Sequence, residues 1–219
     1  MIEMNLLINR MVMFLGGLLL FLQSSVAFSG VYDDLLKAIE DNNTSEVTAI
    51  LQRGMDVNTV DKSGNTLLML AVQKGNLDLL KFLIGHRARI HNRNQYGDTA
   101  LMMASLKGHL EMTQLLVTSG AEINHSGWTA LIYAAFEGHT PVVEFLIAKG
   151  AEIDAKAPNH ATALMLAAKN GHVDVVRLLL KAGADAEART PDGITAMKWA
   201  KEAGHSTIIE LLQKAGAKE

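Results

Sequence analysis

The chain has 219 residues, 49% of them hydrophobic and 20% charged, so it can bury one sizeable core and is too apolar for a disordered protein. Its 18 Gly and 3 Pro favour helices joined by glycine-marked turns over a sheet-dominated fold. The net charge of −3, with scattered basic residues, argues against a nucleic-acid partner, and the lack of cysteine excludes disulfides, thiolate catalysis and Cys-based zinc sites.

The first segment, residues 1–27, has the pattern of a secretory signal peptide. One cation, Arg10, precedes an apolar run over residues 11–22, and the small residues Ser25 and Ala27 stand at positions −3 and −1 of a cleavage site. As a helix the run would span about 18 Å, less than the ~30 Å hydrocarbon core, so no stable membrane anchor is expected after cleavage. Retention as a tilted, uncleaved anchor is the alternative. Both predict export, with a periplasmic or secreted location.

The remaining residues, 28–219, contain a short signature that recurs along the chain. It is a Gly-x-Thr triplet, degenerate in its fourth copy, with threonines at Thr66, Thr99, Thr129, Thr162 and Thr195. The threonines are spaced by 33, 30, 33 and 33 residues, and each is followed by an apolar run and a second glycine. Because Thr caps helix N-termini and Gly ends helices, each run is predicted to be a helix. A second apolar run at helical spacing follows each of these glycines and predicts a second helix.

These motifs resemble the ankyrin repeat. The resemblance is carried by G-x-T-[LA]-L-M-x-A, then G-[HN], then L-L in the second helix and G-A-[DE] after it, over residues 31–219. It implies an all-α repeat solenoid in which each unit has a β-hairpin finger and two antiparallel helices. About six units are expected, at residues 31–60, 61–93, 94–125, 126–156, 157–189 and 190–219. The first unit lacks its hairpin, and its helices are expected over residues 31–42 and 44–54.

A single repeat cannot bury its own apolar face, so neighbouring repeats must share one core. The equivalent residues expected to line that core are Leu68, Leu101, Leu131, Leu164 and Met197. Trp199 is also predicted to be a packing residue, at a position that it shares with Leu70, Met103, Tyr133 and Leu166. The last unit is predicted to present a polar outer surface through Lys198, Lys201, Glu202 and Lys214.

Two departures from the repeat concern its loops. Arg87 stands where other repeats end their second helix with glycine, which predicts either mild backbone strain at Arg87 or the use of Gly85 instead. The finger over residues 124–127 is three residues shorter than the others, because its threonine comes after 30 residues and not 33. This shortening either opens access to Trp128 or lets Trp128 fold over the gap.

The titratable residues suggest structural roles more than chemistry. Four histidines follow the inter-helix glycine of successive repeats: His109, His139, His172 and His205. Their fixed place in the repeat indicates a recurring turn, and a haem or metal carrier is a minor alternative. The basic segment 86–93 is interpreted as a solvated loop, with contact to an anionic partner as the alternative. No catalytic motif such as G-x-S-x-G, H-E-x-x-H or a P-loop occurs, so neither enzymatic activity nor a cofactor is predicted.

A candidate binding surface lies at positions that face solvent in the ankyrin family. In the central units these positions turn apolar, with Tyr96 and Trp128 on successive fingers and Leu106 and Phe136 two residues before the inter-helix glycine. We expect the four side chains to meet on the concave surface, because exposed aromatic clusters are typical binding hot spots.

The sequence therefore predicts an exported scaffold that binds a protein through its concave face. The family resemblance suggests that it protects or inhibits a periplasmic client protein. A secreted effector that binds host proteins is the alternative.

Overall fold

The computed structural model describes residues 30–218, which form two compact units on either side of the Met55–Asp56 bond. The predicted signal peptide, residues 1–27, lies outside the described residues. Among residues 30–218, no helix has both the length and the apolar character needed to cross a membrane.

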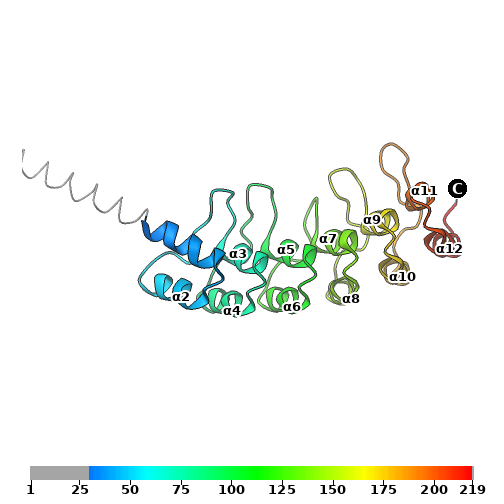
Figure 1. The fold of residues 1–219 in the computed structure, drawn as a ribbon. Coiled ribbons are helices and arrows are strands. Elements are labelled where there is room, and N and C mark those ends of the chain that lie inside the picture. The colour runs from blue at the N-terminus through cyan, green and yellow to red at the C-terminus, as the bar shows by residue number, and fades with distance from the viewer. Residues whose placement is uncertain (1–29, 219) are drawn as a thin grey trace, which may run out of the picture. The chain divides into compact units, whose positions relative to one another are not determined.

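The first unit, described from residue 30, is a pair of helices. The first covers residues 30–40 and the second is α2 (Thr44–Gln52), labelled in Figure 1. Asn43 caps α2, because its side-chain oxygen accepts a hydrogen bond from the Glu46 backbone N–H at 3.2 Å. Both helices turn aliphatic residues inward, which are Leu35, Ala38, Ile39, Val47 and Ile50. The two helices expected from the sequence are therefore present.

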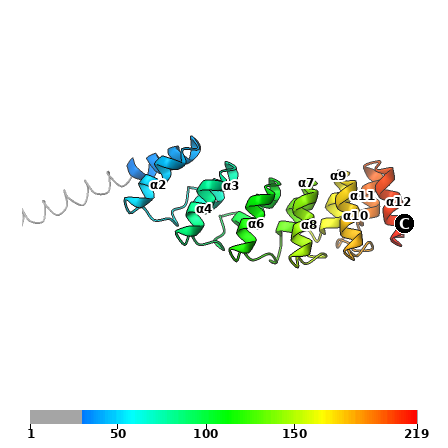
Figure 2. The same cartoon turned by 90° about the horizontal axis from the view of Figure 1, so that it is seen from below.

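The second unit, described from residue 56 to residue 218, consists of five helix pairs in two layers (Figures 1 and 2). The inner layer contains α3 (Leu67–Gln73), α5 (Ala100–Leu106), α7 (Ala130–Glu137), α9 (Ala163–Asn170) and α11 (Ala196–Glu202). The outer layer contains α4 (Leu77–Gly85), α6 (Leu110–Thr118), α8 (Thr140–Ala148), α10 (Val173–Lys181) and α12 (Ser206–Lys214). Each helix packs against its partner and against the next helix of its own layer.

The repeat signature sets the ends of the inner helices. Each signature threonine is an N-cap; the Thr66 hydroxyl, for example, accepts a hydrogen bond from the Met69 N–H at 3.3 Å. The second glycine ends the helix in the left-handed region, with φ of +80° at Gly138 and +82° at Gly171. The recurring Thr and Gly therefore fix the length of each inner helix.

The predicted shared core is confirmed. Its members are 1% exposed in each repeat, and they are Leu68, Leu101, Leu131, Leu164 and Met197. They lie in inner helices that pack side by side, so each side chain loses its contact with water only when the adjacent repeats are in place. Each is expected to stabilise the fold by about 1.5–3 kcal/mol.

The fingers between the helix pairs are tight loops, not strands. Over residues 30–218 the only isolated β-bridge joins Val60 to Thr66. The full-length fingers are closed at their tips by backbone hydrogen bonds, which include one of 2.9–3.0 Å at each of Asp61–Asn65, Asn94–Asp98, Ala157–Ala161 and Thr190–Ile194. The described backbone contains no such bond in the short finger 124–127. That finger is held instead by the Asn124 side chain, which donates a hydrogen bond to the Gly150 carbonyl at 3.0 Å and accepts one from the Glu152 N–H at 2.8 Å.

Replacing Arg87 by glycine should stabilise the protein. Arg87 has φ of +62°, so the first of the two alternatives for this loop is confirmed, and Gly85 remains the last residue of α4. The left-handed region disfavours a side chain by about 1–2 kcal/mol, so Arg87→Gly should raise the free energy of unfolding by about 1 kcal/mol in urea denaturation. Arg89→Gly is the matched control, since its backbone has no positive φ, and it should be neutral or destabilising. Equal effects of both variants would contradict the strain at Arg87.

Removing the hydroxyl of Ser105 should also stabilise the protein. Ser105 is fully buried in α5, and its hydroxyl has no hydrogen-bond partner among the described residues. Alanine fills the same position in α7 and α9, as Ala135 and Ala168, so Ser105→Ala should fit and raise the free energy of unfolding by about 1 kcal/mol. Thr113→Val is the control, because the buried Thr113 hydroxyl donates a hydrogen bond to the His109 carbonyl at 3.0 Å. Loss of that hydroxyl should not stabilise the protein. Loss of stability in Ser105→Ala would show that the hydroxyl has a partner in solution.

Candidate protein-interaction surface

One face of each inner helix is left uncovered by the stack. Counting from the capping threonine, positions 1, 2, 3, 5 and 6 are buried in α3, α5, α7 and α9. Positions 4, 7 and 8 are separated by three and four residues, so they lie on one side of the helix, and most of them keep contact with solvent. We call this side the inner-helix face.

Position 4 of this face is apolar in all five inner helices: Leu70, Met103, Tyr133, Leu166 and Trp199. Trp199 was predicted to be a packing residue, but it is half-buried at the surface, as are Leu70, Met103 and Tyr133, and only Leu166 is buried, at 5% exposed. Trp199 has the Lys169 ammonium over its ring, 4.9 Å from the centroid. The packing interpretation of Trp199 failed because a position that is apolar in every repeat suggests a core. The residues at positions 7 and 8, on the same side of the helix, are mostly polar and indicate the surface instead.

The predicted site residues occupy two parts of the surface. Leu106 and Phe136 hold position 7 of α5 and α7, which pack side by side, and both are half-buried. The polar residues Gln73, Lys169 and Glu202 hold this position elsewhere. Tyr96 lies on the tip of a finger and is 73% exposed. Trp128, half-buried, directly precedes the cap of α7.

Trp128 is held by an aromatic stack on Tyr133, a residue that the sequence did not connect with it. The two ring centroids are 5.1 Å apart and the planes meet at 20°. The Tyr133 hydroxyl donates a hydrogen bond of 2.8 Å to the Asp98 carboxylate on the preceding finger. Burial, then this hydrogen bond and the charge of Asp98, raise the pKa of Tyr133 above its ordinary value. The Asn94 side chain fixes the same finger by accepting from the Asp98 and Tyr96 N–H groups.

Arg93 and His125 form a second link between these two fingers. The Arg93 Nη2 atom donates a hydrogen bond to His125 Nδ1 at 2.8 Å. Because arginine has only donors, Nδ1 must be the acceptor and carries no proton, so the imidazole is neutral. Burial, followed by the nearby Arg93 charge, lowers the pKa of His125, while Glu122 at 3.5 Å acts in the opposite direction. Part of the basic segment 86–93 therefore has a structural role.

Three of the four repeated histidines connect their helix pair to the preceding one. The Nε2 atoms of His139, His172 and His205 lie 2.9–3.1 Å from backbone carbonyls of the preceding repeat, at Leu106, Phe136 and Lys169. A carbonyl only accepts, so each ring donates from Nε2. Two of these carbonyls belong to Leu106 and Phe136, so the histidines fix the helix ends that carry two predicted site residues. Within residues 30–218, no three potential metal ligands lie together.

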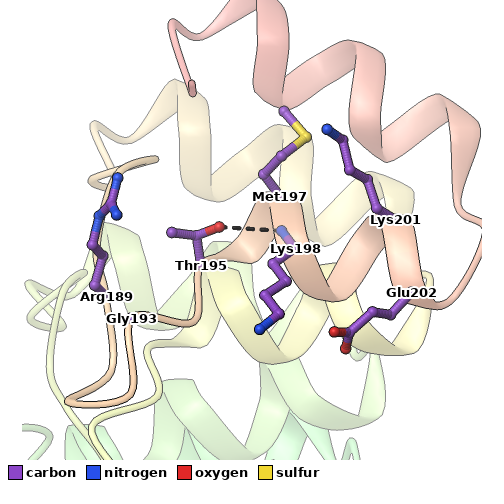
Figure 3. Close-up of a pocket in the computed structure, with 7 residues that line it drawn as sticks. All are labelled: Arg189, Gly193, Thr195, Met197, Lys198, Lys201 and Glu202. Carbon is purple, nitrogen blue, oxygen red and sulfur yellow. Dashed lines mark hydrogen bonds between the residues drawn. The ribbon is translucent and has the colours of Figure 1, made fainter. Parts of the chain in front are cut away.

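A hollow of about 290 Å³ lies at α11 (Figure 3). One wall is the side of α11 that, in the other inner helices, meets the next repeat. Lys198 and Lys201 are exposed there, whereas the equivalent Met165 and Ala168 of α9 are buried. The polar surface predicted for the last repeat is thus confirmed at these lysines. Figure 3 shows them pointing in opposite directions, so the lysines do not converge on one ligand position.

Helix pairs that share one core and leave one face uncovered define a solenoid repeat protein. Models described as ankyrin repeats match residues 35–84, 68–157 and 155–219, so the chain belongs to the ankyrin repeat family. Ankyrin repeats bind other proteins and are generally not enzymes, and the chain is accordingly a protein-interaction scaffold. No curated protein matches the chain.

Mild acid should destabilise the second unit. Burial is the main cause that lowers the pKa of His109 and of His125, so the folded protein disfavours their charged forms. The stability associated with the neutral rings is complete above the ordinary pKa of 6.5 and is lost as the pH falls through the lower folded values. Urea midpoints should therefore fall between pH 7.5 and pH 5.

The variant His125→Asn tests whether His125 is one of the two histidines that cause the loss of stability in acid. The asparagine oxygen can still accept from Arg93 but does not titrate, so the variant should lose less stability on acidification than the wild type. If the urea midpoint of the variant depended on pH as that of the wild type does, His125 would not contribute to the loss of stability in acid.

Proposed function

We propose that this protein is an exported scaffold that holds a protein partner on its inner-helix face. The observation that supports the site is the run of adjoining apolar side chains on α3, α5 and α7. We call it the apolar strip, and it consists of Leu70, Met103, Leu106, Tyr133 and Phe136. Its members Leu106 and Phe136 stand at position 7, where the packing of the repeat makes no demand for an apolar residue, because this position is polar in the other inner helices.

The strip has the properties of a binding hot spot. Its aromatic end is preorganised, because Tyr133 is bonded to Asp98 and stacked under Trp128 before any partner arrives. Ordering side chains at an interface opposes binding by about 0.5–1.5 kcal/mol for each mobile side chain, so fixed rings bind with a smaller entropic penalty. Tyr96 offers an exposed aromatic contact on the neighbouring finger.

Export is supported by the sequence of residues 1–27. A lone cation, an apolar run and small residues at the cleavage positions are typical of secretory signals. The partner is therefore expected outside the cytoplasm, with a periplasmic client as the proposed case. Fractionation of cells and culture medium tests the location, and retention in the cytoplasm would overturn it.

Leu106→Ala combined with Phe136→Ala should weaken partner binding without loss of fold. The full chain, carrying a C-terminal tag, is expressed with its leader in the source cells, and bound proteins are identified by mass spectrometry. Removal of a hot-spot side chain weakens binding by 2 kcal/mol or more, so capture should fall at least ~30-fold.

The control is Leu115→Ala, a half-buried leucine of the outer helix α6. It should leave capture unchanged, and melting curves should show that the double variant remains folded. Unchanged capture by the double variant, or an equal loss in the control, would remove the inner-helix face as the binding site.

A further inference from the structure

The apolar strip has a repeat distance that is set by the stack. Leu70, Met103 and Tyr133 occupy position 4 of three successive inner helices that pack side by side. Helix axes in contact lie about 8–10 Å apart, so these side chains recur at about that distance along the stack. A partner that covers all three must present apolar groups with a similar period.

Regular backbone conformations differ in whether they can supply this period. An α-helix returns to the same side after seven residues, or about 10.5 Å. A β-strand presents one face every two residues, or about 6.8 Å, and again at about 13.6 Å, so it falls out of register. A polyproline II helix repeats after three residues, or about 9.3 Å, and also matches in length.

The width of the strip separates the two remaining conformations. Leu106 and Phe136 lie one helical turn beyond Met103 and Tyr133, so the central part of the strip has two parallel columns. The apolar stripe of an amphipathic helix also has two columns, because apolar residues recur at spacings of three and four. A polyproline II helix presents a single narrow ridge per face. An α-helix therefore comes close to the period and matches the width.

Charges beside the strip give the partner helix a direction. Position 8 holds the exposed Lys74 and Lys107 on α3 and α5, but the exposed Glu137 on α7. A helix with acidic residues over α3 and α5 would meet opposite charges there, whereas the reversed orientation would place acids beside Glu137. Exposed ion pairs are worth little individually, but they select orientation and partner.

We infer that the inner-helix face binds an amphipathic α-helix of its partner, laid along the stack with apolar residues at heptad spacing and acidic residues over α3 and α5. The inference rests on the proposed function and narrows it to one class of partner segment.

Three fluorescein-labelled peptides of about 21 residues, a length of ~31 Å as a helix, test the inference against the full chain. The first has leucine at the first and fourth positions of each heptad and glutamate toward one end. The second has the same composition, with the leucines redistributed around the helix so that they form no single stripe, and the third contains a proline at every third residue. The heptad peptide should bind at least tenfold more tightly than the others by anisotropy. Circular dichroism should show that it becomes helical on binding.

Substitutions in the face provide the matched comparison. Met103→Glu should weaken binding of the heptad peptide at least tenfold, and Leu106→Ser replaces it if that variant does not fold. Leu115→Glu on the outer layer should leave binding of the heptad peptide unchanged. Lys74→Glu with Lys107→Glu should weaken the glutamate-bearing peptide and strengthen a version with lysine at the same end.

The inference would be overturned by equal binding of the respaced peptide, by tighter binding of the proline peptide, or by a bound heptad peptide without helical signal. Failure of the heptad peptide to bind would do the same. If partner capture still depended on Leu106 and Phe136, only the inference would fail. If capture did not depend on them, the proposed function would fail with it.

Discussion

The interaction on which the structure depends is the packing of each inner helix against its neighbours in the stack. The leucine or methionine at position 2 is 1% exposed in every repeat, and no single helix pair could shield it. This requirement assigns most of the inner helix to the core, since positions 1, 2, 3, 5 and 6 are buried from α3 to α9. Functional variation is then confined to positions 4, 7 and 8 and to the fingers. The site could therefore be sought on one helix face.

Contacts between successive repeats also position the candidate surface. Three of the histidines that follow the inter-helix glycines, His139, His172 and His205, bond to carbonyls at the C-terminal ends of the preceding inner helices. These are the ends that carry Leu106 and Phe136. The finger contacts of Asp98 with Tyr133 and of Arg93 with His125 fix the opposite end of α7. The same polar contacts that space the repeats thus hold the apolar strip in one arrangement.

The sequence predicted the fold well because its determinants are local. Thr at the N-cap and Gly at the helix end recur at a fixed period, so the helices followed from spacing, and their pairing and shared core followed from the resemblance to the ankyrin repeat. The binding surface followed only in part. Leu106 and Phe136 stood out because they replace polar residues, whereas Tyr133 was not singled out, since its position is apolar in every repeat. Its contacts with Trp128 and Asp98 join residues that are not at any regular spacing, and only the structure shows them.

The short finger 124–127 has a consequence for the cooperativity of the stack. The full-length fingers are closed by their own backbone bond, so their order is intrinsic to the repeat. The short one is held by contacts with the repeats on both sides. The Arg93 side chain bonds to His125 from the preceding repeat, and the Asn124 side chain bonds to the backbone of Gly150 and Glu152 in the following one. In the nearest-neighbour description of repeat proteins, such contacts move part of the stabilising free energy from the repeat that carries the short finger to the interfaces with its two neighbours. Local fraying that starts at either terminus and reaches these neighbours would then disorder the finger beside Trp128 together with them, and not as an independent event.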